Sequence, residues 1–222
     1  MINIAIDGPA GAGKSTIAKK TAERLGFIYV DTGALYRAVG VAALRRNIDT
    51  SDAAAVSEML ASIKIDLRFQ NGEQRVLLSG EDVSEAIRLP EASMAASNVS
   101  AVPAVRDFLF GLQRRLADEN NCIMDGRDIG TVVLPGAELK IFLTASAEVR
   151  AQRRFAELSE RGTPVEYETL LKEIELRDYN DSHRKTAPLK AAEDAVLIDS
   201  SRLSPDEVIQ IITDKLKEKT GL

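Results

Sequence analysis

The start of the chain carries the feature that most constrains its fold. The apolar stretch Ile2–Ile6 is followed by Gly8-Pro-Ala-Gly-Ala-Gly13-Lys14-Ser15-Thr16, in which four residues separate a glycine from Gly-Lys-Ser. This spacing, between an expected strand and an expected helix, is typical of a phosphate-binding loop. The glycines let successive backbone N–H groups converge on phosphate oxygens, and a helix beginning near Lys14 adds the positive end of its dipole. The motif predicts that the chain binds a nucleoside triphosphate.

Two side chains of the motif have expected roles of their own. Lys14 is expected to reach the outer phosphates, and the Ser15 hydroxyl can ligate Mg²⁺, which is the one cofactor that the sequence implies. A Gly/Ala-rich turn that matches by accident is the alternative. The residues expected to hold the triphosphate are Gly8, Pro9, Ala10, Gly11, Ala12, Gly13, Lys14, Ser15 and Thr16.

Composition excludes several classes of protein. With 222 residues, 45% of them hydrophobic and 28% charged, the chain has the composition of an ordinary soluble globular protein and can bury one good core. A net charge of −5 and a pI of about 5.2 argue against a general nucleic-acid binder, which needs a basic surface. No apolar run approaches the roughly 18 residues of a membrane span, and the chain opens on an expected strand rather than a signal peptide.

The single cysteine gives a further indication. Cys122 cannot form an internal disulfide, which fits a reducing compartment and predicts a cytoplasmic protein. Its neighbours Ile123 and Met124 indicate a buried strand, so Cys122 is expected to be a small core residue rather than a metal ligand or nucleophile.

Apolar segments and helical patterns alternate along the chain, which favours a parallel sheet covered by helices on both faces. Ligands bind at the carboxyl ends of the strands in such sheets. The expected strands are Ile2–Ile6, Phe27–Val30, Asn121–Met124, Leu139–Leu143 and Ala195–Ile198. The expected helices are Lys14–Leu25, Gly33–Arg46, Pro103–Ala117, Ser146–Arg161, Glu166–His183 and Ser204–Lys217.

One stretch interrupts this alternation. Ile63–Phe69 alternates apolar and polar residues, Asn71-Gly72 is a strong type I′ turn signal, and Arg75–Leu78 is expected to return as the second strand of a hairpin. A third strand at Asp82-Val83 and short helices near Ser84–Val99 could follow. We interpret residues 63–100 as an inserted lobe, with an edge hairpin of no function as the alternative.

A phosphate-binding loop alone does not assign an activity, because switches, motors, transporters and kinases share it. The sequence contains no Asn-Lys-x-Asp and no Asp followed by Gly three positions later, so the guanine-reading and γ-phosphate-sensing elements of a GTPase switch are missing. The chain is also small for a helicase or a transporter ATPase. A small kinase is the favoured hypothesis, and a nucleotide-binding module without transfer activity is the alternative.

Two polar clusters follow expected strands at the edge where ligands bind. The first is Asp31-Thr-Gly-Ala-Leu-Tyr-Arg37, where contact with substrate and simple capping of a helix by Asp31 or Thr32 are compatible. Arginine suits phosphoryl transfer because its planar guanidinium binds phosphate through two parallel hydrogen bonds.

The second cluster is Asp125-Gly-Arg127-Asp128. Asp125 could hold Mg²⁺ through water, Arg127 could bind phosphate and Asp128 could accept a hydrogen bond. A polar turn with an internal ion pair is the alternative.

A third cluster lies on two expected helices, on either side of a breaker at Arg161-Gly162-Thr163-Pro164 that could form a lid or a plain connector. Each helix carries charged residues at spacings that share one face, which could also be a solvated, salt-bridged surface. These residues are Arg150, Arg153 and Arg154 on the first helix, and Arg177, Asp181 and Arg184 on the second. The only histidine, His183, is interpreted as incidental, because a phosphate acceptor is already anionic and needs no general base.

Together these motifs resemble the bacterial-type cytidylate kinase family of nucleoside monophosphate kinases. The resemblance covers essentially the whole chain and rests on the opening Ile-Asp-Gly-Pro-Ala-Gly-Ala-Gly-Lys-Ser, the Asp31–Arg37 motif, Asp125-Gly-Arg-Asp-Ile-Gly-Thr131, and the Arg177–Arg184 helix leading into Thr-Ala-Pro-Leu. It implies a P-loop α/β fold, with a five-stranded parallel sheet flanked by helices and an antiparallel insert in the monophosphate-binding lobe. It also implies transfer of the γ-phosphate of ATP to CMP or dCMP with Mg²⁺, in pyrimidine nucleotide metabolism.

The resemblance implies roles for residues at matching positions, although Thr32 stands where some members carry Ser, and Leu35 where others carry Met or Ile. The cytosine-reading set is Ser97, Arg106 and Asp128, and the contacts to the monophosphate or the transferring group are Arg37, Arg127 and Arg184. Arg177 and Asp181 are implied sugar and phosphate contacts. The wider CMP site adds Thr32 and Tyr36, the ATP site adds Arg153, and the implied catalytic set is Lys14, Arg127, Arg177 and Arg184.

Cytosine chemistry fits this set. Its N4 amino group is a donor that Asp128 and Ser97 can accept, and its O2 and N3 acceptors suit Arg106. Uracil reverses the pattern at positions 3 and 4, and such a mismatch corresponds to a preference of roughly 10²–10⁴-fold. Other small kinases, acting on AMP, UMP or a metabolite that is not a nucleotide, are the enzyme alternatives.

The expected organisation is a single kinase domain over residues 1–222. Its expected parts are a core (1–62, 101–152 and 166–222), an inserted monophosphate-binding lobe (63–100) and a lid (153–165). A monomer is expected, with ATP and CMP or dCMP as small-molecule partners and with no nucleic-acid or membrane partner.

Overall fold

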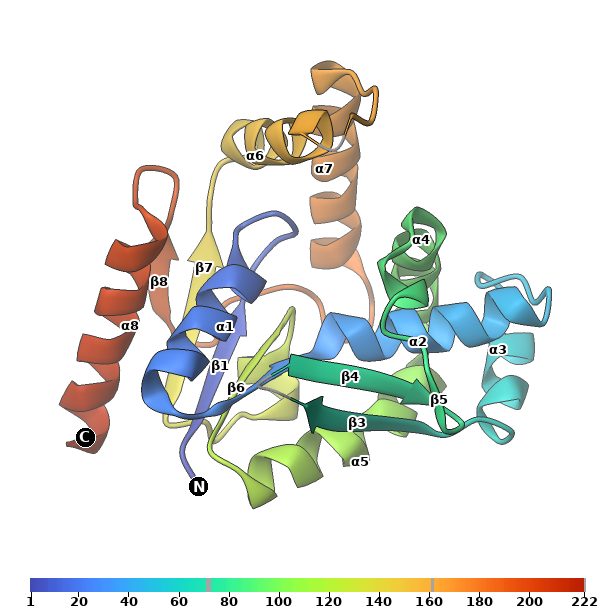
Figure 1. Ribbon diagram of the computed structural model, residues 1–222, viewed down its shortest axis with the longest axis horizontal. Helices are drawn as coiled ribbons and strands as arrows, with labels where there is room; N and C mark the ends of the chain where they lie inside the picture. The colour runs from blue at the N-terminus through green and yellow to red at the C-terminus, as the bar shows by residue number, and fades with distance from the viewer. Residues whose placement is uncertain (71–72, 161, 222) are drawn as a thin grey trace. The chain divides into compact units, whose positions relative to one another are not determined.

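The computed structural model describes residues 1–70, 73–160 and 162–221 (Figure 1). Five strands form the main sheet in the order β2-β6-β1-β7-β8. Within it, β1 pairs in parallel with β7, and β7 with β8, so that Ile4 lies opposite Leu139 and Ile141 opposite Val196. The predicted five-stranded parallel sheet is confirmed. The strands are β1 (Asn3–Asp7), β2 (Ile28–Asp31), β6 (Cys122–Gly126), β7 (Leu139–Thr144) and β8 (Val196–Asp199).

All six helices expected from the sequence form, with ends that differ from the prediction by a few residues. They are α1 (Lys14–Leu25), α2 (Thr32–Arg45), α5 (Pro103–Glu119), α6 (Ala147–Glu160), α7 (Tyr167–His183) and α8 (Pro205–Thr220). The short helices expected near residues 84–99 are η1 (Ala86–Arg88) and α4 (Pro90–Val99). Helix α3 (Ala53–Leu60) and the π-helical turn η2 (Ile129–Val133) were not predicted. None of the described helices is long and apolar enough to cross a membrane.

The chain divides into two compact units. The first contains Met1 and Phe27–Cys122, and the second contains Ile2–Gly26 and Ile123–Leu222. The expected division into core, lobe and lid was drawn on different grounds and stays a prediction, and its lid segment includes residue 161, which lies outside the described residues.

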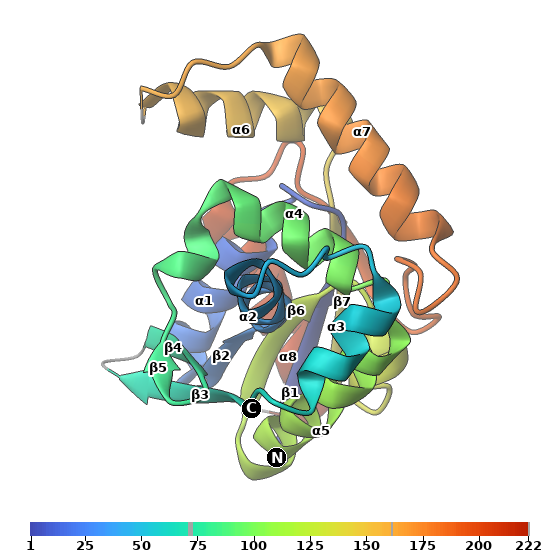
Figure 2. The same ribbon diagram turned by 90° about the vertical axis from the view of Figure 1, so that its right-hand side faces the viewer.

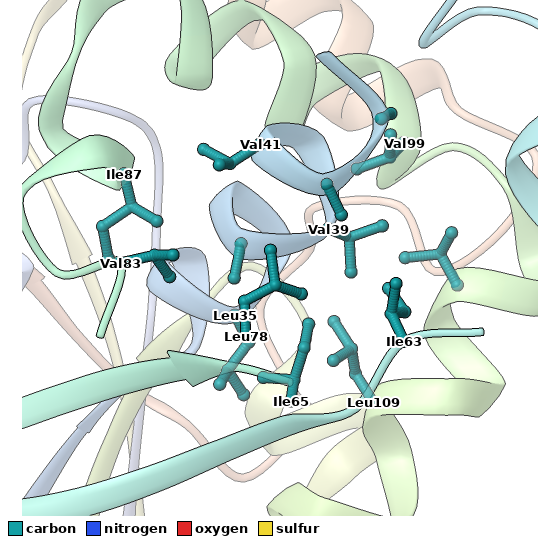
Figure 3. Packing of buried hydrophobic residues seen from close by; sticks show 14 of the residues in the cluster. Leu35, Val39, Val41, Ile63, Ile65, Leu78, Val83, Ile87, Val99 and Leu109 are labelled. Carbon is teal, nitrogen blue, oxygen red and sulfur yellow. The ribbon is translucent and has the colours of Figure 1, made fainter. Parts of the chain in front are cut away.

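The core of the first unit is built around α2. Leu35 and Val39 of α2 point into a cluster that also receives Ile65, Leu78 and Leu109 (Figure 3). Most residues of α2 are buried, because α4, α5 and β4 (Glu73–Leu78) all pack against this helix. The helix therefore needs small residues where a neighbour approaches closely.

The predicted hairpin is confirmed as part of an antiparallel three-stranded sheet in the first unit. Its order is β3-β4-β5, with β3 at Ile65–Gln70 and β5 at Glu81–Asp82. The register of β3 and β4 places Ile65 opposite Leu78. The predicted Asn71-Gly72 turn lies outside the described residues.

In the second unit, α1 packs against α8, and β7 leads into α6. Helices α6 and α7 pack against each other and lie beyond the carboxyl end of β7, as both views show (Figure 2). The segment between β1 and α1 reaches the same end of these strands. Strand ends and α7 are thereby brought to one side of this unit.

A pair of glycines in helix interiors tests the packing of α2. A Cβ on Gly40 would lie 2.7 Å from the Cβ of Ala95 in α4, whereas a Cβ on Gly111 of α5 would meet only the Arg115 side chain, at 3.8 Å. Both Gly→Ala changes gain helix propensity of about 0.5–1 kcal/mol, and only Gly40→Ala adds an overpacking cost of about 1–3 kcal/mol. Urea unfolding should therefore show Gly111→Ala as more stable than wild type, and Gly40→Ala as less stable than Gly111→Ala by that cost. Equal gains in both variants would contradict the close packing of α2 on α4.

Candidate functional site

The loop between β1 and α1 has the backbone of a phosphate cradle. Gly8, Gly11 and Gly13 have positive φ angles of 148°, 76° and 87°, which other residues rarely adopt. A Cβ on Gly8 would overlap the carbonyl oxygen of Leu143. The N-cap residue of α1 is Gly13, which has no side chain that could cap the helix. A phosphate could therefore bind the N–H groups of the first turn in place of a capping side chain.

Lys14 lies inside this loop. Its side chain is buried, with 5% of its surface exposed, and Nζ donates a hydrogen bond to the carbonyl oxygen of Pro9 at 2.7 Å. Burial, and next the positive charge of Arg127, lower the pKa of Lys14 to about 7, while Asp125 and Asp7 act in the opposite direction. A buried ammonium with nearby positive charge is a favourable partner for an anion.

Ser15 and Asp125 bring two oxygen ligands together next to the loop. The Ser15 hydroxyl donates to Oδ2 of Asp125 at 2.9 Å, and Asp125 is buried at β6. No group of three or more His, Cys, Asp or Glu residues that could hold a metal occurs in the described residues. One hydroxyl and one carboxylate still suit Mg²⁺, which keeps several waters and takes its other oxygens from phosphate.

The cluster that follows β6 is joined by two crossed ion pairs to Asp181 of α7 and to Arg184, the residue directly after that helix. Arg127 Nε donates to Oδ2 of Asp181 at 2.8 Å, and Arg184 Nη2 lies 3.5 Å from Oδ1 of Asp128. All four side chains are largely buried. Each side of this contact thus provides one arginine and one aspartate, and each of them pairs with the opposite charge on the other side. The predicted clusters at 125–128 and 177–184 come together within the second unit.

Arg177 belongs to the same group of charges. It precedes Asp181 by one helical turn of α7, its Nε is buried, and its positive charge contributes to the lowered pKa of Lys14. Four basic side chains thus share one region of the second unit, namely Lys14, Arg127, Arg177 and Arg184.

The arginines of α6 do not share one role. Arg150 is buried; it binds both carboxylate oxygens of Asp178 at 3.0 and 2.5 Å and donates to the carbonyl oxygen of Ala10, in the loop, at 3.0 Å. Arg153 donates to the backbone carbonyl of Ser200 at 2.7 Å. Arg154 instead pairs with Glu157 at 2.8 Å on the exposed side of the helix.

The Asp31–Arg37 cluster lies in the first unit. Oδ1 of Asp31 accepts the N–H of Ala34 at 3.0 Å, so Asp31 caps α2, and its Oδ2 pairs with Arg37 at 2.6 Å. Thr32 is buried as the first residue of α2. The capping alternative is therefore observed for Asp31, and it leaves the predicted roles of Thr32 and Arg37 untested.

The remaining predicted residues of the first unit lie on α2, α4 and α5. The guanidinium of Arg106 lies over the Tyr36 ring, 5.6 Å from its centroid, and donates to the carbonyl of Ser100 at 3.2 Å. Ser97, on α4, accepts at its own carbonyl from the Ser100 hydroxyl at 2.8 Å. Arg106 is buried although it carries a charge. A cation held over an aromatic ring is fixed in direction.

Sequence reasoning missed two features of the site and correctly predicted that Cys122 is a core residue. It gave no role to Asp7, whose carboxylate lies next to the loop, or to the tie between Arg150 and Asp178. Only the position of Asp7 at a strand end could have drawn attention to it. Cys122 is a buried core residue, as expected. His183 is exposed and stacked on Tyr179, and its interpretation as incidental stays a prediction.

The sequence is similar to known proteins over nearly its whole length. The model of the cytidylate kinase family matches residues 4–218. A cytidylate kinase from Caldicellulosiruptor bescii is 56% identical over 213 residues, covering 96% of this chain and 94% of that protein. One from Caldanaerobacter subterraneus subsp. tengcongensis is 52% identical, covering 99% of this chain and 96% of that protein.

The chain belongs to the cytidylate kinase family. The match spans the phosphate-binding loop, both polar clusters and α7. Among solved structures, a gluconokinase from Sinorhizobium meliloti 1021 covers 98% of this chain, and 92% of that chain is covered, with a TM-score of 0.51 and 15% identity. That likeness supports the α/β kinase fold, and the family assignment comes from the sequence relatives.

Asp7 should make stability depend on pH. Burial raises its pKa from 3.8 to about 6, against the opposing effect of two backbone hydrogen bonds, so the folded state binds more protons than the unfolded state between those values. The free energy of unfolding should therefore fall as the pH rises through this window, by up to about 3 kcal/mol at about 1.36 kcal/mol per pKa unit.

Asp7→Asn removes this titration, and its effect on the contacts with the N–H groups of Ile129 and Gly130 does not itself vary with pH. Urea unfolding of both proteins between about pH 4 and pH 7 should show the difference in unfolding free energy shifting toward the variant by about that amount. A difference that stays constant across the window would contradict the raised pKa of Asp7.

Proposed function

We propose that the chain transfers the γ-phosphate of ATP to CMP or dCMP, giving ADP and CDP or dCDP. The observation that carries the proposal is the group of basic side chains Lys14, Arg127, Arg177 and Arg184 beside a glycine-rich loop, in a chain of the cytidylate kinase family. Phosphoryl transfer depends on positioning and on positive charge around the moving group, and this cluster supplies both.

The donor is proposed to lie on the loop between β1 and α1. Backbone N–H groups of residues 8–16 would bind the phosphates of ATP, and Lys14 would reach the outer ones. The positive φ angles of Gly8, Gly11 and Gly13 support this role, since they turn successive amides toward one point. Arg153 of α6 is proposed as a further ATP contact. Its hydrogen bond to the carbonyl of Ser200 holds it near the carboxyl end of β8.

The acceptor is proposed to lie at the carboxyl end of β6 and along α7. Arg127 and Arg184 would bind the monophosphate or the transferring group, and Arg177 and Asp181 the sugar and phosphate. Their crossed ion pairs support this role, because a carboxylate that holds an arginine in place reduces the entropy lost when phosphate binds. The proposed acceptor is already an anion, so no general base is needed.

Asp128 is proposed to read the cytosine base. Its carboxylate accepts hydrogen bonds only, which suits the N4 amino group of cytosine and opposes the O4 of uracil. The further residues proposed to bind CMP are Thr32, Tyr36, Arg37, Ser97 and Arg106. The fixed direction of the Arg106 guanidinium over Tyr36 supports its part in that set.

Mg²⁺ is the proposed cofactor. Ser15 would bind it directly and Asp125 through water, and both offer the oxygen ligands that Mg²⁺ prefers. When bound, the ion would neutralise charge on the phosphates of ATP. Cytoplasmic location and a monomeric state stay predictions from the sequence.

Lys14→Ala tests the donor side. The variant should lose ADP formation with CMP by at least about 10²-fold, because it removes the positive charge that is proposed to reach the outer phosphates. Burial already disfavours the Lys14 ammonium, so the variant should keep its fold, checked by circular dichroism and urea unfolding. Lys20→Ala, an exposed position on the same helix, is the matched control and should retain full turnover. Turnover retained in Lys14→Ala would remove Lys14 from the mechanism.

Asp128→Asn tests the reading of the base. Asparagine has the same shape but presents an N–H₂ donor that suits uracil, so the ratio of kcat/KM for CMP to that for UMP should fall by roughly 10²-fold or more. Asp118→Asn, on an exposed part of α5, is the control and should leave the ratio unchanged. If Asp128→Asn slows both acceptors equally, the cytosine assignment is wrong.

A further inference from the structure

Asp7 is a buried carboxylate that the proposed function does not use. It is the last residue of β1, directly before the phosphate-binding loop, and only 4% of its surface is exposed. Both of its oxygens accept backbone hydrogen bonds, Oδ1 from the N–H of Ile129 at 2.8 Å and Oδ2 from the N–H of Gly130 at 2.7 Å. A buried charge is tolerated only when it is bound in this way.

These two bonds fix the start of the π-helical turn η2. The residue that precedes the turn is Asp128, whose carbonyl accepts the N–H groups of Val132 and Val133 at 2.9 and 3.2 Å. The carbonyl of Asp128 is thus bonded to the end of η2, and the first two residues of η2 are bonded to Asp7. Its side chain faces Arg184, and the preceding residue, Arg127, faces Asp181.

The turn is also confined from a second strand. A Cβ on Gly130 would lie 3.3 Å from Oδ2 of Asp7 and 3.3 Å from Cδ of Lys140. Lys140 belongs to β7, and its Nζ donates to Asp194 at 2.9 Å. Gly130 therefore lies between a carboxylate from β1 and an anchored side chain from β7, where a larger residue would displace the turn.

We infer that Asp7 is a positioning residue for acceptor recognition. Its carboxylate holds the N–H groups of Ile129 and Gly130 and thereby sets where Asp128 and Arg127 stand relative to α7. A carboxylate suits this task because its two oxygens accept two N–H groups at once, whereas an amide offers one acceptor and one donor. The inference rests on the proposed function, since it takes Asp128 to read the base.

Asp7→Asn is the variant that tests this role. The amide nitrogen would face a backbone N–H, so the turn should shift and misplace Asp128. Steady-state assays should show KM for CMP raised by about 10-fold and the CMP-to-UMP ratio of kcat/KM lowered by about 10-fold, because a misplacement near 1 Å can cost up to about 10²-fold. KM for ATP should rise less than KM for CMP, since the loop glycines and Lys14 are retained and Asp7 is one of the smaller influences on the pKa of Lys14.

A second variant reaches the same contact from the other side. Gly130→Ala should lower the CMP-to-UMP ratio in the same direction, and the double variant should lose less than the product of the two single effects, because both act through one contact. Asp52→Asn is the matched control: its carboxylate also accepts two backbone N–H groups, from Ala54 and Ala55, at the start of α3. It should leave KM and the ratio unchanged.

The outcomes of these assays distinguish a positioning role of Asp7 from a purely structural one and from a role in the donor loop. A fall in kcat for both acceptors alike, with their ratio unchanged, would show that Asp7 only supports the fold and would overturn the inference. A raised KM for ATP with an unchanged ratio would assign Asp7 to the donor loop and overturn it as well. If Asp7→Asn does not fold, Gly130→Ala decides alone, by the ratio. If Asp128→Asn keeps the wild-type ratio, the proposed role of Asp128 fails and the inference falls with it. A lowered ratio in Asp128→Asn but not in Asp7→Asn overturns the inference only.

Discussion

Buried positive charge is the constraint on which the rest of this structure depends. Lys14, Arg127 and Arg184 are removed from water, and each has polar contacts that hold it: Lys14 bonds to the carbonyl of Pro9, and the two arginines lie in the crossed pairs with Asp181 and Asp128. Buried pairs of this kind gain little net stability, because the cost of desolvation offsets most of the attraction. What these pairs do is fix the orientation of each guanidinium group, since Arg127 is held by Asp181 and Arg184 by Asp128.

The positive charges also act on one another. The pKa of Lys14 is lowered by its own burial and by the nearby charges of Arg127 and Arg177. A bound anion would reduce the repulsion between these positive charges and favour the charged form of Lys14. Arg150 extends the same arrangement, because it binds Asp178 of α7 and the carbonyl of Ala10 in the loop. The loop and α7 thus share a buried contact in the second unit, which is the basis for assigning the donor and the acceptor to neighbouring parts of it.

Local patterns could predict the fold where local physics determines it. The glycine spacing located the loop, and alternating apolar runs located the five strands and six of the helices within a few residues. The α3 helix was missed although Asp52 caps it, and η2 was missed because Ile129–Val133 is rich in β-branched residues and is held in its turn by Asp7, 122 residues earlier in the chain. The crossed partners of Arg127 and Arg184 could not be predicted either, because the sequence shows which charges occur but not which of them meet.

The choice of acceptor is tested most directly by the rate of ADP release from Mg²⁺·ATP in the presence of CMP, dCMP, UMP, AMP or shikimate. CMP and dCMP should be phosphorylated with kcat/KM roughly 10²-fold or more above the other acceptors, because of the two pyrimidines only cytosine presents an amino donor at position 4 to Asp128, and adenine and shikimate do not have the shape of a pyrimidine. A preference for AMP, UMP or shikimate, or ADP release that does not depend on any acceptor, would contradict the proposed function.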